Sequence, residues 1–334
     1  MSSSTLMYQE AAEAPEIVRR QIAQNAVEAS RLGALLRQMN PRAVVTCARG
    51  SSDHAATYAK YLIETLTKTI TSSAAPSVAS VYESSPDLRG VLFIAISQSG
   101  KSPDLLTSVE QAKARGAFVL ALCNSPNAPL ATLADALLPL HAGAETSVAA
   151  TKSFLASLSA IAQLLASWTQ SRALSNALIA APDQLNEAWH LDWRSAVPTL
   201  RDAPSLYVIG RGFGLGIAQE AALKLKETCA LHAEAFSSAE VKHGPMTLVR
   251  DGFPVLLFSQ NDETRGGMHK LASEFATRGA RVLAAGDGAR GGGELQRQVD
   301  AVGGGATKEV DHGRRRVGDD AVRGADHAEA HGHR

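Results

Sequence analysis

The sequence predicts an α/β protein of two tandem domains, each a parallel sheet flanked by helices in a three-layer sandwich. Apolar, strand-like runs alternate with helical patterns, which is typical of βαβ units and parallel sheets. The alternation stops for two long helical stretches and then resumes with the same local strings. A chain of 334 residues is also long enough for two domains of ordinary size.

An N-terminal helical segment, residues 1–40, precedes the first domain, 41–172. Apolar side chains recur at helical spacing over 10–39, so we expect one helix there. Within the first domain, short apolar runs that end in turn-rich loops predict buried strands. These strands are expected at 43–48, 78–82, 91–96, 117–122 and 136–140, and helices are expected to end at Glu64 and Ala114.

The second domain, 201–286, follows a helical linker at 173–200 and repeats the first domain. Three strings recur at an offset of 162 or 163 residues. Three agreements at a nearly constant offset indicate a duplicated domain. As first and second copies, the strings are 44–50 and 206–212, 97–98 and 259–260, and 115–117 and 278–280.

The composition changes abruptly near residue 286, and no Ile, Phe, Tyr, Trp, Met or Cys follows. So little apolar surface cannot offset the entropy of ordering, so we expect 287–334 to be an aberrant, disordered tail. The second domain would then be incomplete at its C-terminal end. The change resembles out-of-frame translation of a GC-rich gene, and such a tail would weaken or abolish activity.

Bulk composition excludes several classes of protein. The chain has 33 basic and 33 acidic residues, which gives no electrostatic reason to expect nucleic acid or an anionic membrane as partner. Its three cysteines form no CxxC pair, which argues against a disulfide framework or structural zinc. No apolar run approaches the roughly 20 residues that span a bilayer, and no signal peptide is recognisable. We therefore expect a cytoplasmic protein.

Hydroxyl-rich loops follow two of the predicted strands. The loop 97–102 (Ser-Gln-Ser-Gly-Lys-Ser) lies at the carboxyl end of a strand and opens a helix. Ligands of open α/β sheets bind there, and helix N-termini favour phosphate. The loop 50–52 (Gly-Ser-Ser) occupies the same place after the first strand. Helix capping by Ser99 or Ser102 explains the same residues equally well, and both interpretations stay open.

Charged residues gather on one predicted helix. Glu220, Lys224 and Glu227 are spaced i, i+4 and i+7, so they share a helical face. His243 follows in a tight turn before Gly244-Pro245. Carboxylate, amine and imidazole are the groups that proton transfer beside a sugar carbonyl requires. An exposed salt-bridge face and a structural histidine are the alternatives.

Together these strings resemble the SIS (sugar isomerase) superfamily, with its flavodoxin-like domains. Within it they are similar to the isomerase half of glucosamine-fructose-6-phosphate aminotransferase. The resemblance covers about residues 7–285. Its strings are 97–100 (Ser-Gln-Ser-Gly), 148–152 (Val-Ala-Ala-Thr-Lys), 222–227 (Ala-Leu-Lys-Leu-Lys-Glu), 232–235 (His-Ala-Glu-Ala) and 242–245 (Lys-His-Gly-Pro).

The resemblance implies a role for each matching residue. The positions that would hold the sugar phosphate are Ser52, Ser97, Gln98, Ser99 and Ser102. Val148 would contact the sugar through its backbone. Glu227 would move a proton between C1 and C2, His243 would open the pyranose ring, and Lys224 would contact the substrate. No metal and no organic cofactor is implied.

The resemblance also implies a reaction. The chain starts at the sugar domain without an N-terminal glutaminase domain, as isomerising glucosamine-6-phosphate deaminases do. We therefore expect glucosamine 6-phosphate, a phosphorylated amino sugar, to yield fructose 6-phosphate and ammonia in a homodimer. In the family, the His243 loop reaches the neighbouring subunit's pocket. The alternatives are another amino-sugar phosphate or a non-catalytic sugar-phosphate sensor.

Overall fold

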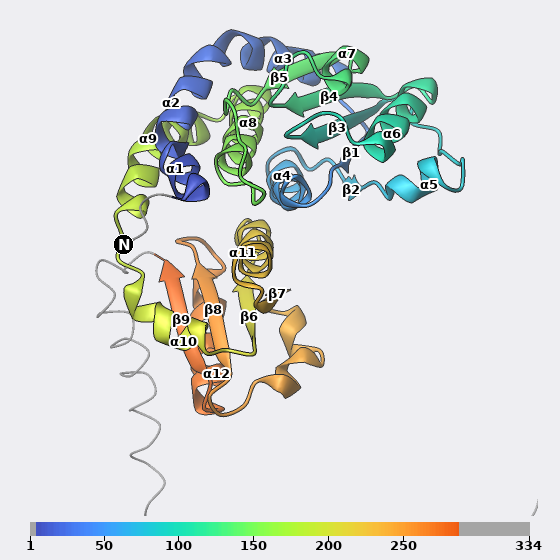
Figure 1. The fold of residues 1–334 in the computed structure, drawn as a ribbon. Helices are drawn as coiled ribbons and strands as arrows, with labels where there is room; N and C mark the ends of the chain where they lie inside the picture. Colours follow the sequence, from blue (N-terminus) through green and yellow to red (C-terminus); the bar gives the residue numbers. More distant parts are fainter. Residues whose placement is uncertain (1–4, 287–334) are drawn as a thin grey trace, which may run out of the picture.

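Two wholly parallel sheets organise residues 5–286, the part of the chain that the computed structural model describes (Figure 1). The first contains β1 (Ala43–Cys47), β2 (Thr71–Ser73), β3 (Val91–Ser97), β4 (Phe118–Cys123) and β5 (Ala136–Pro139), in the order β2-β1-β3-β4-β5. The second contains β6 (Ser205–Gly210), β7 (His232–Ser237), β8 (Pro254–Ser259) and β9 (Arg281–Gly286), in the order β7-β6-β8-β9. The predicted fold class is thereby confirmed. The predictions for 287–334 concern residues outside the described range.

The N-terminal segment contains three helices instead of the single helix predicted. They are α1 (Leu6–Ala12), α2 (Ala14–Gln24) and α3 (Ala26–Met39). Pro15 starts α2 and favours a new helix there. The break between α2 and α3 lies at Asn25. The Asn25 side chain donates to the Pro139 carbonyl at 2.8 Å and contacts His141 Nε2 at 3.0 Å, which holds the chain at this point. The two breaks let the segment wrap around the first domain, as Figure 1 shows in blue.

The prediction of a strand at 78–82 is wrong. This stretch holds the short helix α5 (Pro76–Ser80), which begins at a proline suited to the first turn of a helix. The edge strand is instead β2, which pairs with β1 in parallel. Its sequence Thr-Ser-Ser has no apolar run and gave no strand signal.

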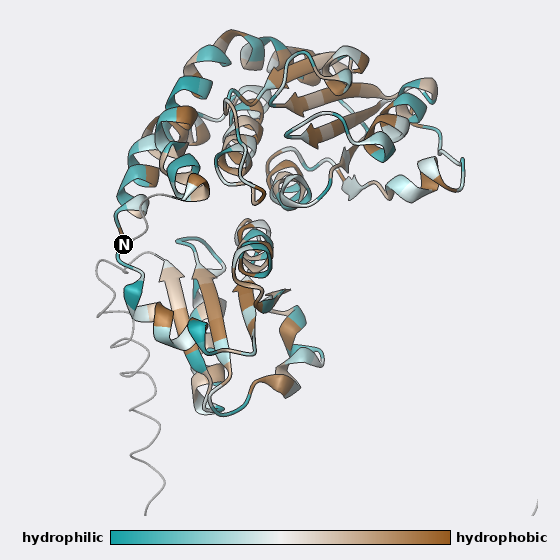
Figure 2. Ribbon diagram, in the orientation of Figure 1, coloured by the Kyte–Doolittle hydropathy of each residue, from teal (hydrophilic) through white to brown (hydrophobic). Residues whose placement is uncertain are grey.

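Helices cover both faces of the first sheet. They are α4 (Ser51–Thr67), α6 (Pro103–Ala114), α7 (Pro129–Leu133) and α8 (Lys152–Thr169). Alternate side chains of β3 enter different cores: Leu92 and Ile94 pack with α3, α4 and α8, while Phe93 packs with α6 and α7. Every residue of β3 is buried, so it is the central strand of a three-layer domain. Figure 2 shows these strands in the brown of apolar residues.

Helical chain joins the two sheets. Helix α9 (Arg172–Trp189) is followed by η1 (Arg194–Ala196) and α10 (Val197–Arg201). The second sheet then carries α11 (Gly214–Cys229) against Leu206 and Val208 on one face, and α12 (Arg265–Thr277) against Tyr207 and Ile209 on the other. Short turns η2 (Glu240–Lys242) and η3 (Pro245–Leu248) follow β7. None of the helices in the described range is long and apolar enough to cross a membrane.

The two domains meet through equivalent helices. The helix that follows the first strand is α4 in the first domain and α11 in the second. Figure 1 shows these two helices next to each other between the sheets. A Cβ on Gly216 would lie 2.5 Å from the His54 carbonyl oxygen and 3.2 Å from the Tyr58 amide nitrogen. Backbones this close require glycine at the crossing point.

The three cysteines differ in accessibility. Cys47 and Cys123 are buried in the first domain, whereas Cys229 is exposed at the C-terminal end of α11. Burial raises the pKa of the Cys47 thiol to about 11.

Candidate active site

Three helices of the first domain begin around one cavity of about 200 Å³. Helix α4 contributes residues 51 and 52, α6 is preceded by the loop 97–102, and α8 contributes residues of its first turn. Helix N-termini carry unpaired N–H groups and partial positive charge, so their convergence favours an anion. The lining residues are Arg49, Ser51, Ser52, Ile96, Ser97, Gln98, Ser99, Ser102, Leu105, Ala150, Ser153 and Phe154.

The five predicted phosphate-binding residues all line this cavity. The Ser97 hydroxyl accepts a hydrogen bond from the Gly100 amide at 2.9 Å, so it shapes the loop. The Ser99 hydroxyl accepts from the Lys101 amide at 3.4 Å. Ser102 is the N-cap residue of α6, yet its side chain makes no capping hydrogen bond. The capping alternative therefore does not account for Ser102, whose side chain lines the cavity.

A positive charge also borders the cavity. Arg49 follows the first strand, and its Nε donates to Asp104 Oδ2 at 3.0 Å. Asp104 lies in the first turn of α6, so the ion pair ties the loops after β1 and β3 together. The Arg49 side chain stays 54% exposed, which keeps the guanidinium accessible to a solvated anion.

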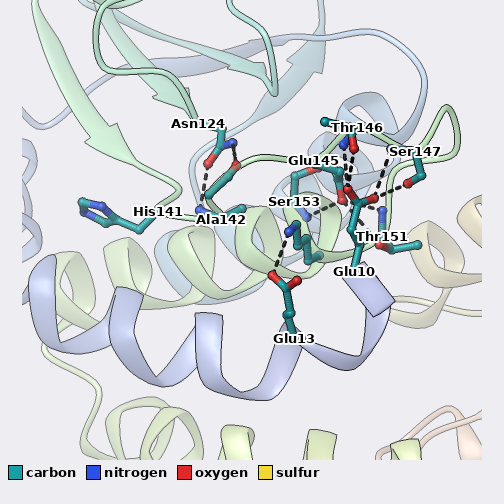
Figure 3. Close-up of polar contacts among 12 residues, drawn as sticks. Glu10, Glu13, Asn124, His141, Ala142, Glu145, Thr146, Ser147, Thr151 and Ser153 are labelled. Carbon is teal, nitrogen blue, oxygen red and sulfur yellow. Dashed lines mark hydrogen bonds and ion pairs between the residues drawn. The ribbon is translucent and has the colours of Figure 1, made fainter. Parts of the chain in front are cut away.

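Two carboxylates hold the loop that forms another wall of the cavity (Figure 3). Glu10 of α1 accepts from the Thr146 amide at 2.6 Å and the Ser147 amide at 3.2 Å. Glu145 accepts from the Thr151 amide at 2.9 Å and from the Ser153 amide at 3.2 Å. The loop is therefore fixed at both ends.

Glu10 is 3% exposed, so its carboxylate is an uncommon buried charge. Burial raises the pKa of Glu10, but the hydrogen bonds from Ser147 and Thr146 outweigh it and leave the pKa lowered. Between the clamped ends, Val148 is 99% exposed, and its side chain points away from the protein. Val148 itself does not line the cavity, although Ala150 does.

A row of charges on α11 lies beside the cavity. Lys224 Nζ is 2.6 Å from Glu227 Oε2 and 3.2 Å from Glu220 Oε1. The same nitrogen donates to the hydroxyl of Ser51, a lining residue from the other domain, at 3.3 Å. The predicted common face of Glu220, Lys224 and Glu227 thus exists and is directed at the other domain instead of at solvent alone. Amine and carboxylate lie at the rim of a hydroxyl-lined anion pocket.

Comparison with known proteins identifies the fold family. The model of the SIS domain family matches residues 38–167 and again residues 199–288. The chain belongs to the SIS domain family. Its two SIS domains correspond to the two parallel sheets.

Several SIS proteins are similar to this chain. The isomerizing glutamine–fructose-6-phosphate aminotransferase of Thermococcus kodakarensis is 34% identical over 260 residues, covering 73% of this chain and 42% of that protein. The chain thus spans about two fifths of the length of such curated relatives. A crystallised Silicibacter pomeroyi protein, to which a phosphosugar isomerase function has been ascribed, is 41% identical with a TM-score of 0.82. That match covers 89% of this chain and 94% of the other.

A further solved SIS structure is the C-terminal domain of glucosamine-fructose-6-phosphate aminotransferase from Francisella tularensis. It is 28% identical, with a TM-score of 0.73, and the match covers 86% of this chain and 85% of that one.

His243, like the side chain of Val148, lies apart from the other predicted site residues. It follows η2 in the second SIS domain and is exposed. Among the described residues, no hydrogen bond or ion pair joins its imidazole to Lys224 or Glu227, and it does not line the cavity. Within one chain the site therefore contains the amine and the carboxylate without this imidazole.

Sequence reasoning missed several residues at the site of the two SIS domains. Arg49, Ser51 and Ser153 line the cavity, and His54 Nδ1 lies 2.8 Å from Glu220 Oε2. Ser51 stands within the Gly-Ser-Ser string that already signalled hydroxyls, and His54 follows one helical turn later. The pairing of His54 with a residue 166 positions away has no signal in one sequence.

Proposed function

We propose that this SIS protein is an isomerising deaminase, which converts glucosamine 6-phosphate into fructose 6-phosphate and ammonia. The observation that carries the proposal is the Lys224–Glu227 pair at 2.6 Å, with Lys224 also contacting Ser51 at the rim of the phosphate-sized cavity. A phosphate in the cavity would bring the sugar chain out toward α11. The aminotransferase relatives are named for fructose 6-phosphate, which is the product of the proposed deamination, and this supports a hexose phosphate in the site.

Each residue has a role in the proposed reaction. Ser52, Ser97, Gln98, Ser99 and Ser102 hold the phosphate, and the backbone at Val148 contacts the sugar. In the open-chain substrate, Glu227 takes the proton from C2 and returns it to C1, while a second proton passes from the C2 amine to O1. The C1 aldehyde thereby becomes an alcohol and the C2 amine becomes an imine. Water then adds to the imine and releases ammonia, leaving the ketone. Lys224 holds Glu227 and the substrate hydroxyls in place.

Ring opening requires a further proton carrier, for which we propose His243. Because His243 lies apart from Lys224 and Glu227 in one chain, a second copy would supply it, and the working unit would be a homodimer. We also propose the limits 41–172 and 201–286 for the two SIS domains, with 173–200 as linker.

The deciding experiment supplies glucosamine 6-phosphate without glutamine and follows ammonia and fructose 6-phosphate together. Equal release of both products supports the proposal. The variant Glu227→Gln serves as the inactive control. Turnover of a different amino-sugar phosphate alone would keep the chemistry and change the substrate. Saturable binding of glucosamine 6-phosphate without any product would instead favour a sugar-phosphate sensor.

A further inference from the structure

The interface between the two SIS domains includes a row of three contacts along α4 and α11. Gly216 lies against the backbone of His54 and Tyr58, and Glu220 meets His54 one turn later. Lys224 meets Ser51 one further turn on, at the rim of the cavity. Residues spaced by four share one helix face, so the three contacts form a continuous strip. The strip connects the closest packing of the domains directly to the proposed active site.

Glu220 is the buried member of this strip. It is 6% exposed, and such a carboxylate is costly to bury unless its oxygens are paired. Its Oε2 lies 2.8 Å from His54 Nδ1, and its Oε1 lies 3.2 Å from Lys224 Nζ, an ion-pair contact without the geometry of a hydrogen bond. An ionised carboxylate only accepts hydrogen bonds, so His54 Nδ1 carries the proton in this contact. His54 therefore fixes one oxygen of Glu220 and so directs the other toward Lys224.

The position of the Lys224 ammonium depends on the orientation of the Glu220 carboxylate. The ammonium has three partners, Glu220, Glu227 and Ser51, and a lysine side chain has four flexible carbon–carbon bonds. If Glu220 lost its histidine partner, both of its oxygens would be free to turn toward Lys224. The ammonium would then be drawn into the interface, away from Glu227 and the cavity rim.

From this geometry we propose that His54 is a positioning residue, which acts through Glu220 to hold the Lys224 ammonium beside Glu227 and the sugar-phosphate cavity. His54 does not line the cavity. The kinetic part of this proposal rests on the deaminase function proposed above, whereas the geometric part does not.

The test compares His54→Ala with His54→Asn, whose amide N–H occupies roughly the place of Nδ1–H. Crystal structures should show Lys224 Nζ displaced from Glu227 and Ser51 by about 1 Å or more in His54→Ala, with the position restored in His54→Asn. Turnover of glucosamine 6-phosphate should fall about 10- to 100-fold in kcat for His54→Ala, because misplacement of this size is costly. KM should change little, since the phosphate contacts are intact.

His141→Asn is the matched control. His141 is a partly buried histidine of the same domain that contacts Asn25 at 3.0 Å, far along the chain from α11. Its φ of 53° is one that asparagine tolerates well. We expect unchanged kcat and KM in this variant.

Two outcomes would overturn the proposal. One is a folded His54→Ala protein in which Lys224 keeps its wild-type position. The other is a His54→Ala protein with normal kcat and only a lowered melting temperature, which is what a purely structural contact gives. If wild-type protein converts no glucosamine 6-phosphate, the proposed function fails, and the Lys224 position in the two variants still decides the role of His54.

Discussion

The loops at the carboxyl edges of the two sheets are equivalent in position and different in charge. After β3, residues 97–102 border a cavity and contain no carboxylate, and the first acidic residue of the following helix, Asp104, pairs with Arg49. After β8, the chain places Asp262 where the first domain has Gly100, at the offset of 162 residues. Asp262 Oδ1 accepts from the Thr264 amide at 2.8 Å, and Oδ2 accepts from Gln260 at 2.6 Å.

Asp262 puts a carboxylate inside the loop of the second edge, where the first edge has Gly100. Burial raises the pKa of Asp262, but hydrogen bonds from Thr264 and Gln260 outweigh it and keep the pKa below its usual value. The loop of the second domain therefore carries an anion that its own groups hydrogen-bond, which disfavours a second anion there, whereas the loop 97–102 carries none.

The helices α4 and α11 also differ in charge, and here the charged residues lie on the second domain at positions where the first has uncharged ones. At the same offset, Tyr58 and Leu62 of α4 correspond to Glu220 and Lys224 of α11. The charged residues therefore occur once, on the second domain, and face the open cavity of the first. The proposed anion pocket thus lies in one domain and the proposed proton-transfer groups lie in the other.

The largest effect should come from the charged helix. Glu227→Gln removes the proposed proton carrier and should lower kcat about 10²- to 10⁴-fold, the usual contribution of a general base. Binding of the substrate, measured by calorimetry, should remain within about a factor of three. Glu187→Gln, an exposed carboxylate of α9, is the control and should be fully active. Normal turnover by Glu227→Gln would remove this residue from the mechanism.

The pocket loops should respond unequally to equivalent changes. Ser102→Ala should weaken sugar-phosphate binding roughly tenfold or more, because hydrogen bonds to charged groups contribute about 1.5–3 kcal/mol. Thr264→Val alters the equivalent position of the second domain and should leave binding unchanged. Equal losses in the two variants would show that the second edge also binds the ligand.

Domain docking offers a third test. Gly216→Ala should destabilise the protein by about 1–3 kcal/mol, since the new Cβ would meet the His54 carbonyl oxygen. Gly266→Ala, in a helix where no atom lies within 4 Å of the added Cβ, should be neutral or slightly stabilising. Urea unfolding measures both. A Gly216→Ala protein as stable as wild type would mean that the helices separate easily.

The smallest effect concerns the clamp on the cavity loop. Glu10→Gln should lower the free energy of unfolding by about 1 kcal/mol at neutral pH, because one acceptor is replaced by a donor. The lowered pKa of Glu10 means that its contribution is complete above about pH 4.3, the ordinary value, and is lost as pH falls through the folded-state pKa. The difference between the two proteins should therefore shrink in acid. Glu16→Gln, at a largely exposed ion pair, should show little change at any pH.

Sequence reasoning succeeded where the chain signals its own local structure. The seven apolar residues of β3 and the hydroxyl string after them were predictable because central parallel strands are buried on both faces. The strands β2 and β7 gave no comparable signal, since both lie at sheet edges and carry polar residues. The helical breaks at Glu13 and Asn25 depend on partners elsewhere in the fold.

The site was predictable residue by residue but not as an assembly. Helical spacing placed Glu220, Lys224 and Glu227 on one face, which the structure confirms. It could not show that this face meets Ser51 and His54, because those contacts arise only when two domains dock. Nor could it show that Glu10, from outside the matched SIS region, holds the cavity loop.

The uneven accessibility of the three thiols gives this protein a built-in reporter. Cys229 is exposed two residues beyond Glu227, while Cys47 and Cys123 are shielded. A maleimide dye added to the unaltered native chain would therefore attach at one place, at the end of the helix that carries the proposed proton-transfer groups. Its fluorescence could follow ligand arrival and domain movement in real time without a single engineered residue.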